Sequence, residues 1–259
     1  MLLVEHIHHT IGTTSILTDV CMGVAPGEVV ALCGPNGAGK STLLNIASGE
    51  LTPSEGLVSL LDRTLEEWPA VELARNRAKL SQESNLTFSF KVREVVEMGR
   101  FPHDTPHAHD DVIETCMERV GITELSDRYY TSLSGGEKQR VHFARVLAQL
   151  TDTSGQPKLL LLDEPTSALD LLHQEVALEL AHTLCKEHGF AVLVVLHDLN
   201  LAAAWADRIV LLKDGHVHHS GTPAEVLTQP ILQTIYGIDV LVLSHPNTGR
   251  PVVTIDRAR

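Results

Sequence analysis

No apolar stretch in this sequence approaches the roughly 20 consecutive residues that a membrane-spanning helix requires. The apolar runs at residues 159–162 and 191–196, for example, are much shorter. The N-terminus reads Met1-Leu-Leu-Val-Glu-His and has no basic segment followed by a long apolar one, so we expect no signal peptide. Any role at a membrane is therefore expected to depend on a partner that spans the bilayer.

Basic residues are scarce as well. The 259-residue chain carries 20 Lys and Arg against 33 Asp and Glu, for a formal net charge of -13. Because non-specific binding to nucleic acid depends on basic surface that displaces phosphate counterions, we expect no nucleic-acid partner. The apolar content of 43% is ample for a core, and the length suits one large domain or two small ones.

Cysteine is limited to four residues without a CxxC pair: Cys21, Cys33, Cys116 and Cys185. Scattered cysteines of this kind are typical of reduced structural thiols in a cytosolic protein. A metal site built from these cysteines is therefore not expected.

Histidine, in contrast, is abundant and gathers in three groups, at 6–9, 103–109 and 216–219. Imidazole is a common heme or metal ligand. On a regular strand, however, His6 and His8 share a face while His9 points the other way, which is a poor start for a site. We expect a solvated surface role for these histidines, with cargo binding as the alternative.

The first feature with clear chemistry is a glycine-rich segment between the apolar run 29–33 and an expected helix. Its residues are Gly34, Pro35, Asn36, Gly37, Ala38, Gly39, Lys40, Ser41 and Thr42. A strand, a glycine-rich turn, Lys-Ser and a helix make up the P-loop, whose backbone N–H groups point at phosphate oxygens. Lys40 is expected to reach the β- and γ-phosphates, and Ser41 to ligate Mg²⁺. The sequence thus predicts a nucleoside triphosphate site; the alternative is a glycine turn that binds nothing.

An acidic pair follows the apolar run 159–162. Asp163 lies at the end of this expected strand, where P-loop enzymes place a second Mg²⁺ contact. Glu164 is placed to orient or deprotonate an attacking water. The alternative is a pair of acids at the solvent end of a strand, and the segment 165–170 that follows disfavours it.

The remaining pattern predicts an α/β core interrupted by a mainly helical block over roughly 86–150. We expect helices over 65–79, 92–99, 110–120 and from 133–137 through Leu150, and a helix that begins at Thr222–Pro223. We expect a strand that ends at 80–83, strands at 159–162 and 191–196, and hairpins over 209–217 and 240–255. The strands are continuous apolar runs, as a parallel sheet that is covered on both faces requires.

Six motifs in order resemble those of the ATP-binding subunit of an ABC transporter. They are 34–42 (Walker A), Gln82 (Q-loop), 133–137 (the signature Leu-Ser-Gly-Gly-Glu), 159–164 (Walker B), 167–170 (D-loop) and His197 (switch). The resemblance covers nearly the whole chain. It implies a P-loop NTPase fold, with a RecA-like core, an antiparallel β portion and a helical ABC subdomain. The expected division is an α/β core at 1–85 and 158–222, a helical subdomain at 86–157 and a C-terminal extension at 223–259.

The resemblance also implies the cofactors, ATP and Mg²⁺, and the roles of the site residues. Ser134, Gly135 and Gly136 at a helix start make a second anion site, which belongs to the nucleotide of a second copy in a head-to-tail homodimer. His197 then contacts the γ-phosphate, Asp170 couples the two sites, and Gln82 ties Mg²⁺ and water to the surface that contacts the membrane partner.

One position departs from the family pattern. The family usually carries an aromatic residue before a glycine near the N-terminus, and it stacks on adenine. Here that place falls at Ile11, before Gly12. Loss of stacking, roughly 1–3 kcal/mol by analogy with nucleic-acid binding, leaves the preference for ATP over GTP open.

The segment 88–103 is similar to that of importer ATPases for iron complexes, cobalamin and heme. It lies where the permease docks in that group, and Phe88, Phe90 and Val92 are candidates for the contact, with ordinary core packing as the alternative. The segments 150–157, 167–174 and 245–253 resemble hemin importer ATPases most. This implies two integral-membrane permease subunits as direct partners, and a periplasmic or surface heme-binding protein as an indirect one. It also implies a location at the cytoplasmic face of the inner membrane.

Other functions remain open at this point. The same subunit could serve ferric siderophore or cobalamin import. A soluble, non-transport ABC ATPase would call for a coiled-coil insertion or tandem cassettes plus basic surface, and none is visible. A small-molecule P-loop kinase has no use for the signature segment.

Overall fold

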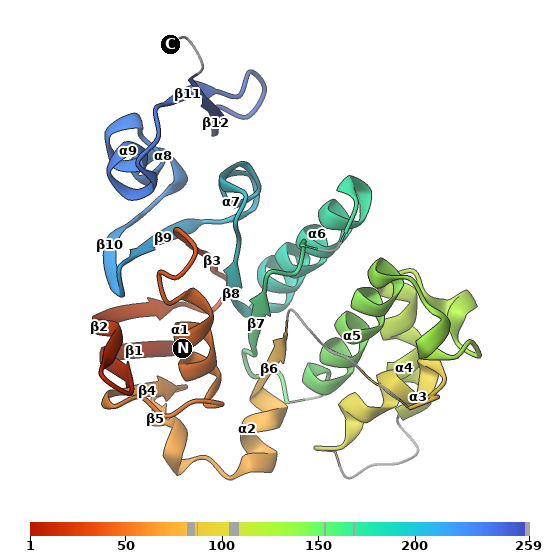
Figure 1. Cartoon of the computed structure of the whole chain (residues 1–259). Helices are drawn as coiled ribbons and strands as arrows, with labels where there is room; N and C mark the ends of the chain where they lie inside the picture. Colours follow the sequence, from red (N-terminus) through yellow and green to blue (C-terminus); the bar gives the residue numbers. More distant parts are fainter. Residues whose placement is uncertain (82–85, 87, 104–108, 153, 168, 257–259) are drawn as a thin grey trace.

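The computed structural model describes residues 1–81, 86, 88–103, 109–152, 154–167 and 169–256. Its centre is a six-stranded sheet in the order β10-β9-β3-β8-β7-β6 (Figure 1). The strands are β3 (Val29–Cys33), β6 (Arg77–Leu80), β7 (Leu159–Asp163), β8 (Ala191–Val195), β9 (Arg208–Lys213) and β10 (His216–Gly221). All neighbours pair in parallel except β10, which returns antiparallel to β9.

The central strands are buried on both faces, as their continuous apolar runs predicted. In β7, Leu160 and Leu162 enter one hydrophobic cluster while Leu159 and Leu161 enter the other. The alternation follows from the pleat, which points successive side chains to opposite faces. The sheet therefore separates two cores, one on each side.

The first core lies between this sheet and a second, antiparallel one. The second sheet has the order β2-β1-β4-β5 and contains β1 (Leu2–Ile11), β2 (Thr14–Val24), β4 (Glu55–Leu60) and β5 (Arg63–Thr64). Helix α1 (Lys40–Ser48) packs in the same core through Leu43 and Leu44, which are fully buried. The fold thus holds the start of α1 against β2.

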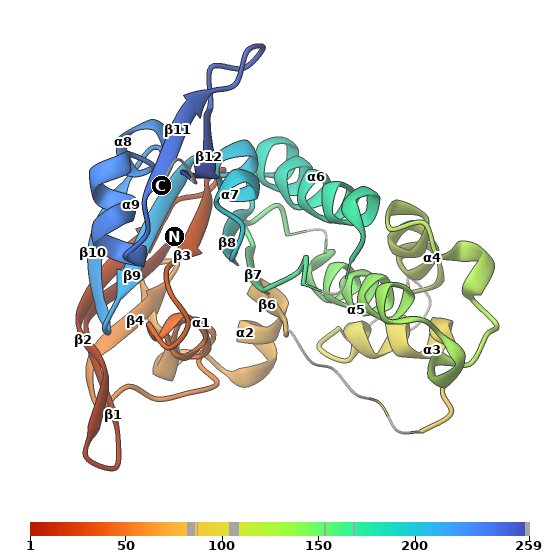
Figure 2. The same cartoon turned by 45° about the horizontal axis from the view of Figure 1, so that its top comes forward.

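The second core joins the sheet to helices. α6 (Leu171–His188) and α7 (Leu199–Trp205) contribute to it, and so do α3 (Val92–Glu97), α4 (His109–Arg119) and α5 (Gly135–Leu150). In both views α3, α4 and α5 form a lobe on the side away from β1 and β2, and α6 lies beside α5 (Figures 1 and 2). The lobe is tight: a Cβ on Gly99 would lie 2.2 Å from the carbonyl oxygen of Arg145 in α5, so only glycine fits there.

The C-terminal part contains α8 (Pro223–Val226), α9 (Gln229–Tyr236) and a hairpin of β11 (Val240–Ser244) and β12 (Pro251–Ile255). The hairpin packs against α7. The Asn200 side chain accepts a hydrogen bond from the N–H of Val253 at 2.8 Å and donates one to its carbonyl at 3.1 Å. Arg250 adds a bond of 2.7 Å to the carbonyl of Ala203. Within the described part of the chain, no helix combines the length and the apolar character that crossing a membrane demands.

The structure confirms the predicted strands at 159–162 and 191–196, both hairpins, the helix through Leu150 and the helix start at Thr222. The helix predicted over 65–79 is wrong in extent. Residues 65–67 form a 3₁₀ turn, α2 (Ala70–Asn76) is short, and 77–80 form β6 instead. The backbone of 77–80 pairs with 159–162 of β7, and its alternation of polar and apolar residues buries Ala78 and Leu80 in the core. Val92, proposed from the sequence as a docking residue, is fully buried and belongs to the core.

Candidate functional site

The functional residues meet at the carboxyl ends of β3, β7 and β8. Residues 34–39 connect β3 to α1, Glu164 directly follows β7, and His197 follows β8 by two residues. Parallel pairing aligns these ends, and Asp163 lies opposite Val195 in register. One pocket results, and its lining is Ile16, Asn36, Gly37, Gly39, Lys40, Ser41, Thr42, Glu164 and His197.

The loop before α1 takes its shape from glycine. Gly39 has a φ of 99° and caps α1, and Gly34 lies so close to β9 that a Cβ would be 2.0 Å from the Leu212 carbonyl oxygen. Lys40 is buried, and its ammonium donates to the carbonyls of Gly34 and Pro35, each at 2.9 Å. Burial lowers the pKa of Lys40, opposed chiefly by the charge of Glu164. A cation and the N-terminus of a nine-residue helix thus border the same pocket, which suits a polyphosphate anion.

Glu164 and His197 form a pair across the pocket. Nε2 of His197 lies 2.5 Å from Oε1 of Glu164. Glu164 has a φ of 49°, a left-handed conformation that non-glycine residues seldom adopt and that gathers at functional sites. The bend that follows β7 places the carboxylate among the pocket's lining residues.

Asp163 and Ser41 supply the oxygen ligands that a magnesium ion prefers. The Asp163 carboxylate is buried, the Ser41 side chain is near enough to act on its pKa, and its Oδ1 has no hydrogen-bond partner among the described residues. Burial raises the pKa of Asp163, and the nearby Lys79 ammonium opposes the shift. A buried carboxylate oxygen with spare acceptor capacity beside a hydroxyl fits Mg²⁺, which takes oxygen ligands and only one or two carboxylates. Gln82, the third residue assigned to the metal, lies outside the described residues.

The signature residues lie elsewhere, in the helical lobe. Ser134 caps α5, and the Glu137 carboxylate accepts from its N–H at 2.7 Å and its hydroxyl at 2.8 Å. Ser134 and Gly135 are exposed, and neither they nor Gly136 line the pocket at Lys40. The two sets of anion-binding groups are therefore not brought together within one copy of the chain.

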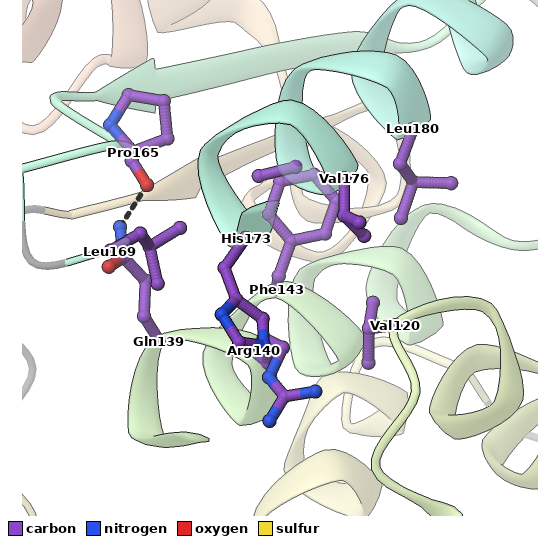
Figure 3. A pocket seen from close by; sticks show the side chains of 10 residues that line it. Val120, Gln139, Arg140, Phe143, Pro165, Leu169, His173, Val176 and Leu180 are labelled. Atoms are coloured by element: carbon purple, nitrogen blue, oxygen red, sulfur yellow. Dashed lines mark hydrogen bonds between the residues drawn. The ribbon is translucent and has the colours of Figure 1, made fainter. Parts of the chain in front are cut away.

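A glutamine links the signature helix to the acidic loop (Figure 3). The side-chain amide of Gln139 in α5 donates to the carbonyl of Pro165, directly after Glu164, at one side of a small apolar pocket between α5 and α6. Gln174 of α6 donates to the carbonyls of Thr166 and Leu169, each at 3.1 Å. These two side chains connect the loop after Glu164 to both helices.

Asp170 caps α6 at the end of this loop. Its carboxylate accepts from the N–H of His173 at 3.0 Å and lies 2.6 Å from Nδ1 of the same residue. These bonds to His173 lower the pKa of Asp170. The exposed carboxylate stands outside the pocket at Lys40, as Ser134 does.

Sequence reasoning missed three residues. Ile16 lines the pocket, whereas Ile11 is 62% exposed and is not part of the lining. Lys79 acts on Asp163 and bonds Glu50 at 2.6 Å. Gln139 contacts the loop after Glu164. No sequence motif identifies these three residues, because each contacts the site only through packing between segments that are distant in the sequence.

A strand, a glycine-rich loop with a buried lysine, and acids at the neighbouring strand end define a P-loop nucleoside triphosphatase with an α/β fold, as predicted. The chain belongs to the ABC transporter family, whose model matches residues 17–167, more than half of its length. As an ABC ATP-binding domain it binds nucleotide and hydrolyses ATP in support of transport.

The chain is similar to proteins that span the same length. The hemin import ATP-binding protein of Pseudomonas putida is 49% identical over 98% of this chain and 99% of its own. The protein of that name from Rhodococcus jostii is 50% identical over 94% and 82%. Among solved structures, an inward-facing metal-chelate type ABC transporter matches with a TM-score of 0.82 and 27% identity, over 98% of this chain and 96% of its own. A dimeric bacterial ABC cassette matches with a TM-score of 0.76 and 30% identity, over 86% and 98%.

Proposed function

We propose that this chain is the ATPase of a hemin importer. The observation that carries the proposal is the 49% identity to a hemin import ATP-binding protein over nearly the full length of both chains. Ferric siderophore or cobalamin import is the alternative. The likeness to a metal-chelate type transporter is compatible with any cargo of the iron-complex, cobalamin and heme group. A soluble, non-transport role is the lower-ranked alternative.

Lys40 and the N–H groups of residues 34–42 hold the β- and γ-phosphates of ATP. Glu164 orients or deprotonates the attacking water. His197 holds the Glu164 carboxylate through the 2.5 Å bond and contacts the γ-phosphate. Ser41, Asp163 and Gln82 hold Mg²⁺, which neutralises charge on the phosphates. The buried position of Asp163 supports this assignment.

The working unit is a head-to-tail homodimer. Ser134, Gly135 and Gly136 of one copy complete the nucleotide site that starts at Lys40 of the other, and Asp170 lies near the interface. Support comes from the exposure of Ser134 and Gly135 away from the pocket. The existence of a dimeric cassette at 30% identity supports a dimer. ATP then holds two copies together, and hydrolysis releases them.

Two integral-membrane permease subunits dock on the helical lobe. Phe88 and Phe101 are 72% and 81% exposed, and exposed apolar surface of this kind marks a site of contact with another protein. Phe101 lines an open pocket together with Phe90, Met98 and His103. The division into a core (1–85 and 158–222), a helical subdomain (86–157) and an extension (223–259) places this surface in the subdomain. The chain then lies at the cytoplasmic face of the inner membrane, and a heme-binding protein acts from the other side.

Reconstitution of the chain with its co-purified membrane partner tests the proposal. Vesicles should take up heme when ATP and Mg²⁺ are supplied, and uptake should stop with Lys40→Ala. Ferric siderophore and cobalamin are the comparison cargoes. Uptake of one of these without heme would contradict the hemin assignment while leaving the ATPase role intact.

A further inference from the structure

Three different metal-ligand types meet on the outer face of the β1–β2 hairpin. His6 Nδ1 lies 2.8 Å from Asp19 Oδ1 and 3.7 Å from Cys21 Sγ. The three donor atoms all lie within 4.8 Å of one another. None of these residues lines the pocket at Lys40, so the ATPase site leaves them unexplained.

The cluster exists because both strands are irregular at this point. Glu5 and His6 of β1 together face Cys21 of β2, and one step further His8 faces Thr18 and Asp19. His6 and Asp19, the extra residues of these two bulges, have φ values of 49° and 50°. The bulges therefore turn a histidine and an aspartate toward each other from strands whose regular alternation would not pair them.

The fold accommodates the bulge of β1 through a glycine on the next strand. A Cβ on Gly56 of β4 would lie 2.4 Å from the carbonyl oxygen of His6 and 2.5 Å from that of Glu5. Any side chain at Gly56 would therefore force the bulge out of place. The conformation of His6 is thus fixed by packing in the sheet, and is not an incidental feature of an exposed turn.

The donor separations resemble those of a tetrahedral zinc ion. Zn–N, Zn–O and Zn–S bond lengths at tetrahedral angles put N and O about 3.3 Å apart and N and S about 3.6 Å apart. The 3.7 Å between His6 and Cys21 matches, and the 2.8 Å between His6 and Asp19 has to widen by about half an ångström. Both side chains have room to do so, since those of His6 and Asp19 are 75% and 60% exposed.

The surroundings of the cluster supply two further imidazoles. The backbone N–H of His6 donates to Cys21 Sγ at 3.2 Å, and this contact holds Sγ beside the His6 ring. His8 and His216 are close enough for their charges to act on the Asp19 carboxylate, and no lysine or arginine is among the groups that do so. Either imidazole is a candidate for a fourth ligand, with water as the alternative.

We propose that His6, Asp19 and Cys21 form a zinc-binding site on the outer face of the β1–β2 hairpin. The mixed imidazole, carboxylate and thiolate set suits a borderline-soft divalent cation rather than Mg²⁺ or Ca²⁺. The proposed zinc site does not depend on which cargo the importer carries.

Cobalt is the probe, because a cobalt–thiolate bond absorbs in the near ultraviolet. The tag-free full-length chain, without nucleotide and with a non-thiol reductant, is titrated with Co²⁺ and then with Zn²⁺. We expect one Co²⁺ per chain, a thiolate-to-cobalt band, and its loss when Zn²⁺ displaces cobalt. The other cysteines of the chain are buried, so the band reports on Cys21.

The variants are Cys21→Ser, His6→Asn and Asp19→Asn. Asparagine tolerates a positive φ, so the two bulges are kept while a ligand is removed or weakened. Cys21→Ser should abolish the band, and each variant should weaken Zn²⁺ binding by at least about tenfold. His188→Asn, at an exposed histidine at the end of α6, is the matched control and should bind as the parent does.

Basal ATPase activity and circular dichroism report whether each variant is folded, since none of these residues lines the nucleotide pocket. A parent protein without the band would overturn the proposal. So would a band that survives in Cys21→Ser, or a loss of affinity in His188→Asn equal to that in His6→Asn.

Discussion

Glu164 is held in a strained backbone conformation, with a φ of 49°, directly after a fully buried strand. The strain aims its carboxylate at the same pocket as Lys40 and His197. Local strain of this kind costs of order 1–3 kcal/mol and persists because the surrounding fold over-determines it. The residue is therefore placed for chemistry at the expense of stability.

Glu164→Gln tests that placement. The amide keeps the size of the side chain but cannot accept the proton of an attacking water, so hydrolysis should fall by about 10²–10⁴-fold. ATP binding should persist, and an ATP-bound dimer should accumulate in size-exclusion chromatography. Glu175→Gln, at an exposed acid of α6, is the control. Normal turnover in Glu164→Gln would contradict the assignment of Glu164 as general base.

Asp163 gives a prediction about pH and stability. Burial raises the pKa of this carboxyl, so without metal the ionised form destabilises the folded state. The stability that the group contributes is fully present below its ordinary pKa of 3.8 and is lost as the pH rises through the raised value.

Asp163→Asn should therefore raise the melting temperature of the nucleotide-free protein at pH 7, while abolishing hydrolysis supported by Mg²⁺. The gain should shrink as the pH is lowered toward 4. Thermal unfolding measured from pH 4 to 8, for parent and variant, checks the sign. A variant that is less stable than the parent at pH 7 would contradict the metal-site interpretation of the buried carboxylate.

At the scale of elements, α5 connects the signature residues to the loop that follows Glu164. Its first residues are the signature, and its fifth residue, Gln139, contacts the carbonyl of Pro165 beside Glu164. A shift of the helical lobe therefore acts on the acidic loop through one side chain. Gln139 is a positioning residue on this view, since it does not line the pocket at Lys40.

Gln139→Leu should lower the rate of hydrolysis by about tenfold while ATP still binds, because the loop after Glu164 loses its link to α5. Gln149→Leu is the matched control on the same helix, where the amide bonds the carbonyls of Ala74 and Arg77. Both variants should lose about 1 kcal/mol of stability through broken hydrogen bonds. Equal rates of hydrolysis in the two would contradict a specific role for Gln139.

At the scale of the whole molecule, the nucleotide site is divided between copies. Helix α1, which begins at Lys40, and helix α5, which begins at the signature, belong to different parts of the fold, as both views show (Figures 1 and 2). A closed two-fold dimer resolves this, since each copy then offers one part to the other.

Mixing two inactive variants checks the dimer. Lys40→Ala should abolish binding of the phosphates, and Ser134→Arg should block the signature end. A mixed dimer has one intact site, so the mixture should regain about a quarter of the parent activity if subunits pair at random. Each variant alone should stay inactive. A mixture that also stays inactive would count against sites shared between copies.

Local sequence determined the P-loop, the buried parallel strands and the cap of α5. The glycines, Lys40 and Ser134 act through their own backbone neighbourhood, and the double-sided burial of β7 and β8 is written in continuous apolar runs. For the same reason the family resemblance was readable from motifs alone.

Tertiary structure alone decided the rest. Residues 77–80 extend the sheet because they pair with β7, and Ile16 lines the pocket because β2 packs over the P-loop. The regular alternation expected for His6 and His8 was broken by bulges that Gly56 accommodates. Contacts between distant segments determine where these residues lie, and a local sequence pattern does not report such contacts.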